Sequence, residues 1–140
     1  MTRILFALCI AFSLVSCQPV LDDQTILGSW KVEKAEIKAI NPNITQDAMN
    51  QTKKRMEATR YSYLEDGSLT VSRGNGEVYK GGTWMLDLNR GILTMQEKYK
   101  EMQLPSVLWK IDMSTDRTMT VTSTQEGKLT TTLHLSKVGQ

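Results

Sequence analysis

The segment "RYSYLEDGSLTVSR", from Arg60 to Arg73, carries the clearest fold signal in the chain. Its apolar residues alternate with polar ones on both sides of the pair Asp66-Gly67, at Tyr61, Tyr63, Leu69 and Val71. Alternation with a period of two around an Asp-Gly pair is typical of a β-hairpin with one apolar face. We therefore expect two antiparallel strands that turn the same face toward a core.

The same alternation continues on both sides of this hairpin. The first strand begins near Ile26, and its pattern shifts by one residue between Val32 and Ala35, which indicates a bulge. Short turns such as Asn75-Gly76 separate the later runs, and Gly81-Gly82 would let one strand kink. The apolar positions of these runs are Trp30, Val32, Trp84, Leu86, Leu88, Leu93, Met95, Val107, Trp109, Ile111, Met113, Met119, Val121, Leu133 and Leu135.

These runs predict an all-β domain over residues 26–140 with roughly eight antiparallel strands. Strands with one apolar face need a shared interior, and a meander of about eight strands closes into an up-and-down barrel. The lumen of such a barrel holds side chains or one small ligand. A two-sheet sandwich is the alternative, but consecutive hairpins without a long crossover favour the barrel.

One short helix is expected between the first two strands, from Thr45 to Thr59. Thr45 suits the N-cap, Asp47 lies in the first turn and basic residues follow near the end. Met49, Thr52 and Met56 share one face at helical spacing. Such a helix would lie over the mouth of the barrel, either as a lid or as a plug.

The chain begins with a leader, residues 1–16, in which Arg3 precedes an apolar stretch too short to span a bilayer. The sequence Leu14-Val15-Ser16-Cys17 resembles the lipobox of bacterial lipoproteins. That resemblance implies cleavage before Cys17, a diacylglycerol on its thiol and acylation of the new amine. An ordinary secretory signal is the alternative. Residues 17–25 would then form a lipidated tether, and acyl chains would hold the protein at the bilayer.

Cleavage before Cys17 changes the charge balance of the chain, and the residue after the cysteine bears on its location. Without the leader, the 17 basic residues become 16, against 15 acidic ones, so nucleic acid is not an expected partner. Gln18 is not the aspartate that retains lipoproteins in the inner membrane of some bacteria. The resemblance therefore implies a lipid-anchored protein of the bacterial cell envelope, in the outer membrane.

The order of elements over about Ile26 to Val138 resembles bacterial lipocalin-like domain lipoproteins. The residues that carry this resemblance are "LGSW", "YSYLEDGSL", "GGTWMLD" and "LTTTLHLSK". The family's Gly-x-Trp element corresponds to Gly28-Ser29-Trp30, and its basic residue near the end of the last strand corresponds to Lys137. In a closed meander the last strand lies antiparallel to the first, so Lys137 would cover Trp30 and close one end structurally.

The sequence offers few residues suited to catalysis, and we expect no enzyme, no metal and no cofactor. The only histidine, His134, alternates with threonines and should face solvent. No second histidine or free cysteine supplies metal ligands or a nucleophile–base pair. The glycines at Gly74 and Gly76 belong to a turn, since no strand–helix context for a phosphate loop surrounds them.

Two functions remain. In the first, the barrel binds a small apolar or amphipathic ligand, lined by Tyr61, Tyr63, Trp84, Met95, Trp109 and Met119. These side chains would otherwise simply fill the barrel. In the alternative, a barrel with a solid core is a protein-interaction or inhibitor module, by analogy with small barrel lipoproteins that block lysozymes. Its contact loop would be the irregular charged segment Gln96–Pro105.

Overall fold

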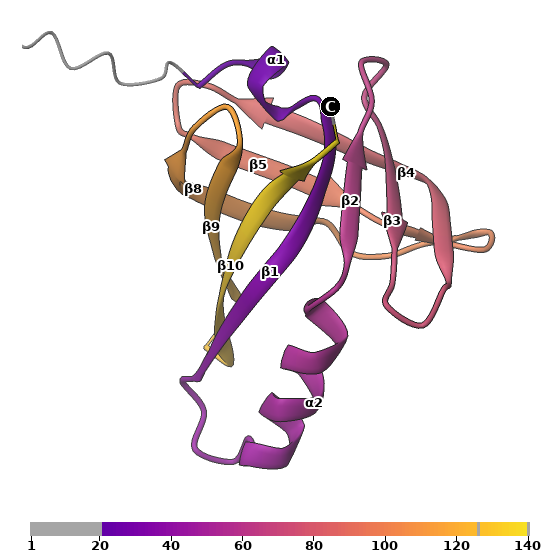
Figure 1. The fold of residues 1–140 in the computed structure, drawn as a ribbon. Helices are drawn as coiled ribbons and strands as arrows, with labels where there is room; N and C mark the ends of the chain where they lie inside the picture. Colours follow the sequence, from indigo (N-terminus) through magenta and orange to yellow (C-terminus); the bar gives the residue numbers. More distant parts are fainter. Residues whose placement is uncertain (1–20, 126, 140) are drawn as a thin grey trace, which may run out of the picture.

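In a computed structural model, which describes residues 21–125 and 127–139, eight antiparallel strands form a closed barrel (Figure 1). The predicted leader and Cys17 lie outside the described residues. The elements are α1 (Asp23–Ile26), β1 (Gly28–Ala39), α2 (Gln46–Met56), β2 (Arg60–Tyr63), β3 (Ser68–Ser72), β4 (Val78–Asp87), β5 (Ile92–Gln96), β6 (Lys98–Tyr99), β7 (Met102–Gln103), β8 (Val107–Ser114), β9 (Thr118–Gln125) and β10 (Leu129–Val138).

The strand order around the barrel is β1-β10-β9-β8-β5-β4-β3-β2, and β2 pairs with β1 to complete the ring. Each barrel strand pairs with its predecessor and its successor in the barrel, as expected for an up-and-down meander. The predicted all-β fold is therefore confirmed, and the sandwich alternative is wrong. Closure pairs the start of β1 with the end of β10, where Trp30 lies opposite Lys137.

Two local predictions about the strands are also confirmed. The hairpin around Asp66-Gly67 pairs Tyr61 with Val71 and Tyr63 with Leu69. Asp66 stabilises the turn, because its Oδ1 accepts hydrogen bonds from the backbone N–H and the hydroxyl of Ser68. The register of β1 against β10 shifts between Val32 and Lys34, at the predicted bulge.

The core lies inside the ring and consists of the alternating apolar side chains. Its buried members are Ile26, Trp30, Val32, Ala35, Tyr61, Tyr63, Leu69, Val71, Leu93, Met95, Trp109, Met119, Val121, Leu133 and Leu135. The prediction for Leu88 was wrong, since this side chain is 49% exposed. The reason is that β4 ends at Asp87, so Leu88 already belongs to the turn before β5.

Two short helices lie at opposite ends of the barrel (Figure 1). The predicted helix α2 has Thr45 as its N-cap and packs against β1, but it ends at Met56 rather than Thr59. The chain turns there because Ala58 adopts a left-handed φ of 67°. Helix α1 was not predicted, and it contains Asp23 to Thr25, which were expected to belong to the tether. Its last residue, Ile26, is fully buried in the core.

The segment Gln96–Pro105 is not the irregular loop that the sequence predicted. It forms a small hairpin from β6 and β7, drawn in orange in Figure 1, which packs against β4. The backbone N–H of Leu104 donates to the carbonyl of Glu97, and the side chain of Gln96 donates to the carbonyl of Leu104. These bonds fix the base of the hairpin beside one end of the barrel.

Within the described ranges, no helix is long and apolar enough to cross a bilayer.

Candidate ligand-binding site

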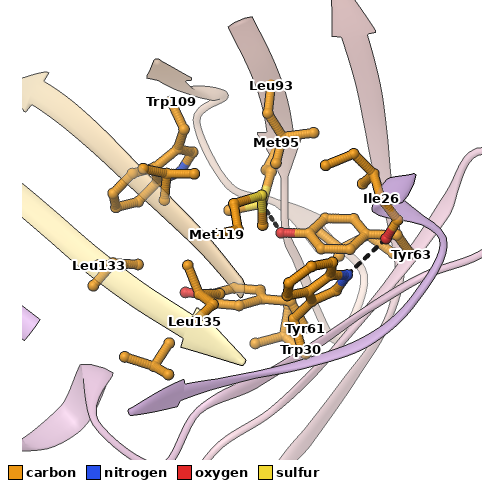
Figure 2. Packing of buried hydrophobic residues seen from close by; sticks show 14 of the residues in the cluster. Ile26, Trp30, Tyr61, Tyr63, Leu93, Met95, Trp109, Met119, Leu133 and Leu135 are labelled. Atoms are coloured by element: carbon orange, nitrogen blue, oxygen red, sulfur yellow. Dashed lines mark hydrogen bonds between the residues drawn. The ribbon is translucent and has the colours of Figure 1, made fainter. Parts of the chain in front are cut away.

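The end of the barrel next to α1 is closed by Trp30 and Lys137. The Nζ of Lys137 lies 5.3 Å from the ring centroid of Trp30 and donates to the carbonyl of Thr25 at 3.1 Å. The indole Nε1 of Trp30 donates to the carbonyl of Ile26 at 2.7 Å, as Figure 2 shows. Gly28 permits this packing, because a Cβ there would lie 3.1 Å from Cε of Lys137 and its φ is +110°.

Three of the six predicted ligand-lining residues do not line the internal cavity described below. Tyr63 and Met119 are buried in the filled part of the barrel, where the Tyr63 hydroxyl donates to Sδ of Met95 (Figure 2). Trp84 packs edge-on against Tyr63, with 5.6 Å between the centroids. It is only partly buried, its Nε1 donates to the carbonyl of Leu64, and it borders a shallow surface groove beside α1.

The other three, Tyr61, Met95 and Trp109, line a cavity of about 310 Å³ at the α2 end of the barrel. Its lining residues come from the α2 end of the strands: Glu97 directly follows β5, and Gln125 is the last residue of β9. The remaining lining residues are Met56, Arg73, Leu104, Pro105, Val107, Ser123 and Thr131. The cavity is thus open space inside the closed ring, on the side away from Trp30.

One wall of the cavity carries polar side chains, those of Trp109, Ser123 and Thr131. Trp109 is 4% exposed, and its Nε1 has no hydrogen-bond acceptor among the described residues. Ser123 and Thr131 lie opposite each other on β9 and β10, and both side chains are buried. A buried donor without an acceptor costs about 1–3 kcal/mol. The nitrogen itself is buried, so it is the ring of Trp109 that borders the cavity.

The entrance of the cavity has a charged pair, Arg73 and Glu97. Nη2 of Arg73 lies 2.5 Å from Oε2 of Glu97, and the two side chains are 25% and 17% exposed. Burial opposes the charged form of Arg73, but Glu97 and Tyr61 outweigh it and raise the pKa of the guanidinium. Burial, and then the charge of Glu97, raises the pKa of the Tyr61 hydroxyl to about 12.

Outside this entrance lies a larger groove of about 740 Å³, which shares Met56, Arg73 and Leu104 with the cavity. Its floor is aromatic: Tyr79 packs edge-on against Tyr99 at 5.2 Å, and Cζ of Arg73 lies 5.5 Å from the Tyr79 centroid. The other lining residues are Thr52, Lys54, Arg55, Gly74, Asn75 and Glu77. The cavity and groove therefore meet at Arg73.

The polar half of the cavity was not predicted, although the alternation of the strands contained the signal. Arg73 continues the inward spacing of Leu69 and Val71, and Glu97 continues that of Leu93 and Met95. Polar residues at the inward positions of other strands follow the same rule, namely Ser123, Gln125 and Thr131. Following the alternation to the strand ends, rather than following apolar residues alone, would have found them.

The histidine of the chain lies outside the barrel. His134 is on the outer wall, where Nδ1 lies 3.3 Å from the Thr120 hydroxyl and Nε2 lies 3.3 Å from Glu36. Within residues 21–125 and 127–139, no three His, Cys, Asp or Glu side chains group closely enough to hold a metal ion.

Comparisons of the chain with models of protein families, with curated proteins and with solved structures found no match.

Proposed function

We propose that the protein binds a small amphipathic ligand in the cavity at the α2 end and acts without catalysing a reaction. The observation that carries this proposal is a hollow of about 310 Å³ inside an otherwise filled barrel, with Trp109 at its wall. Small-molecule sites have volumes of about 300–1,000 Å³, lined by apolar side chains and a few polar groups. The cavity meets both criteria.

The two kinds of lining residue support an amphipathic rather than a purely apolar ligand. Met56, Met95 and Val107 offer flexible or branched apolar contacts. Ser123, Thr131 and Arg73 offer polar contacts in the same cavity. A ligand with an apolar body and a polar group would satisfy both.

The proposal extends to the location. A lipid on Cys17, as the resemblance to lipoproteins implies, would anchor the protein to the bacterial envelope, in the outer membrane. The chain between Cys17 and Leu21 spans at most about 14 Å. Such an anchor would therefore hold the α1 end near the bilayer and turn the mouth of the cavity away from it. Palmitate labelling of the protein in a bacterial host tests this: Cys17→Ala should abolish the label, and a labelled variant would contradict it.

The binding proposal is tested by filling the cavity. Ser123→Phe places a large side chain at an inward position of the cavity, whereas Thr124→Phe, its neighbour on β9, points outward and is the matched control. The protein is purified without denaturant, and the bound small molecules are extracted and analysed by mass spectrometry. The proposal expects a compound from the wild type and from Thr124→Phe, and its loss from Ser123→Phe.

Empty extracts from all three, together with no uptake of added amphiphiles, would overturn the binding function. Equal yields from Ser123→Phe and Thr124→Phe would place the ligand elsewhere. Melting temperatures of both variants show that each is folded before the extracts are compared.

One observation favours the second candidate, a module that binds another protein through Gln96–Pro105. The β6–β7 hairpin presents Met102, which is 60% exposed, beside the groove. Scrambling this segment and repeating a pull-down from the envelope fraction tests the candidate. Loss of a co-purified protein would support it, and unchanged recovery would refute the contact segment.

A further inference from the structure

The charged side chains around the entrance indicate which ligand charge the cavity favours. Among the described residues that line the cavity, Arg73 is the only basic one and Glu97 the only acidic one. In the described lining of the groove outside, Lys54, Arg55 and Arg73 face a single acidic residue, Glu77. The Glu77 carboxylate already accepts a hydrogen bond from the Tyr79 hydroxyl at 2.7 Å. The entrance thus carries an excess of positive charge, which attracts anions.

Arg73 stands where a ligand would pass from the cavity into the groove, since it lines both. Its position is fixed on two sides, by the ion pair with Glu97 and by the ring of Tyr79. A guanidinium has five N–H donors in one plane, and the bond to Glu97 uses Nη2. Arg73 therefore keeps donors for a second anionic partner without leaving Glu97.

We infer that the ligand is anionic, with its apolar part in the cavity and its carboxylate or similar head group bound by Arg73 at the junction with the groove. This inference rests on the proposed binding function and adds the ligand's charge and direction. An apolar part in the cavity contacts Met95 and Trp109, while the head group stays at the partly solvated entrance. A neutral amphiphile of the same length lacks the contact with Arg73.

Glu97 has the opposite effect from Arg73 in this arrangement. Its carboxylate occupies part of the guanidinium and repels an incoming anion. Removing the charge of Arg73 therefore weakens the binding of an anion, and removing the charge of Glu97 strengthens it. A pair that served only to hold the entrance in shape would respond differently, because either substitution breaks the same ion pair. The two variants would then change binding in the same direction.

The experiment compares dodecanoate with 1-dodecanol, binding to the full chain by titration calorimetry. The variants are Arg73→Met and Glu97→Gln, and Arg60→Gln is the control. Arg60 is exposed at the start of β2 and lines neither the cavity nor the groove, so this control removes one positive charge without touching the entrance. Melting temperatures show whether each variant is folded, and Arg73→Gln replaces Arg73→Met if the latter is not.

The wild type should bind dodecanoate at least about ten-fold more tightly than 1-dodecanol, as expected for a charge-assisted bond. Arg73→Met should remove that difference, Glu97→Gln should increase it, and Arg60→Gln should change it by less than about three-fold. Equal affinities of the wild type for both amphiphiles would overturn the inference and leave the binding function standing. The inference would also be overturned if Arg73→Met and Glu97→Gln changed the affinity for dodecanoate in the same direction. If neither amphiphile binds, the binding function fails as well.

Discussion

The two ends of the barrel are built from the same alternating strands, but one is filled and the other is hollow. At the α1 end, Trp30 and Ile26 are fully buried, and the polar tips of Trp30 and Lys137 bind backbone carbonyls. At the α2 end, the inward positions include Ser123 and Thr131, and Nε1 of Trp109 has no partner in the described part of the chain. The ring of strands is continuous, so the difference comes from the inward side chains at each end.

This difference separates residues that stabilise the fold from residues available for a ligand. A side chain whose apolar surface and polar atoms are all satisfied within the protein contributes to stability. A side chain that borders open space contributes less, and a bound molecule can supply the contacts that it lacks. Trp30 belongs to the first kind and Trp109 to the second, although both are tryptophans on the inner face.

The largest expected effect is a difference between the two tryptophans in stability. Trp30→Ala should lower the free energy of unfolding by about 3–5 kcal/mol, as for a large side chain in a packed core. Trp109→Ala should cost clearly less, because its side chain already borders the cavity and has fewer contacts to lose. Urea unfolding followed by circular dichroism measures both. Equal losses would show that the two ends are packed alike.

High pH should destabilise the protein through its buried tyrosines. The pKa of Tyr61 is raised to about 12, mainly by burial, and that of Tyr63 is raised well above 10. Below pH 10 these hydroxyls are protonated in both states, so they add no pH dependence. Above it the unfolded chain loses protons that the folded chain keeps, and stability falls until the folded pKa is passed. The slope approaches about 1.4 kcal/mol per pH unit for each tyrosine.

The variants Tyr61→Phe and Tyr63→Phe divide this slope between the cavity and the filled interior. Unfolding by urea is measured between pH 9 and about pH 11, a range that spans an ordinary tyrosine pKa. Each variant should lose part of the wild-type slope. A slope unchanged by Tyr63→Phe would contradict burial of that hydroxyl.

A smaller effect is expected from Lys137→Met at the closed end. The substitution removes the contact with the Trp30 ring and the bond to Thr25, with a cost of about 1–2 kcal/mol. Because Lys137 lies at the end opposite the cavity, binding of dodecanoate to the folded variant should stay unchanged. Urea unfolding gives the first quantity and calorimetry the second. A large loss of affinity would mean that the two ends are coupled.

The sequence predicted the barrel better than it predicted the cavity, for physical reasons. Alternation and turn residues act locally, so the hairpin at Asp66-Gly67 and the bulge after Val32 could be recognised from the residues alone. Helix α1 could not, because four residues carry no helical period and the burial of Ile26 depends on the whole barrel. The cavity depends on how the volumes of side chains from many strands add up. No single segment contains that information, even though the inward position of Arg73 was readable.

The central claim is that a ligand binds at the α2 end and not at the α1 end, and the three tryptophans of the chain report on it separately. In a ¹H–¹⁵N spectrum each indole N–H gives one signal, which Trp30→Phe, Trp84→Phe and Trp109→Phe assign. Addition of dodecanoate should shift the Trp109 indole signal and leave that of Trp30, already bonded to Ile26, in place. Saturable binding that moves the Trp30 signal, or leaves that of Trp109 unchanged, would contradict the account.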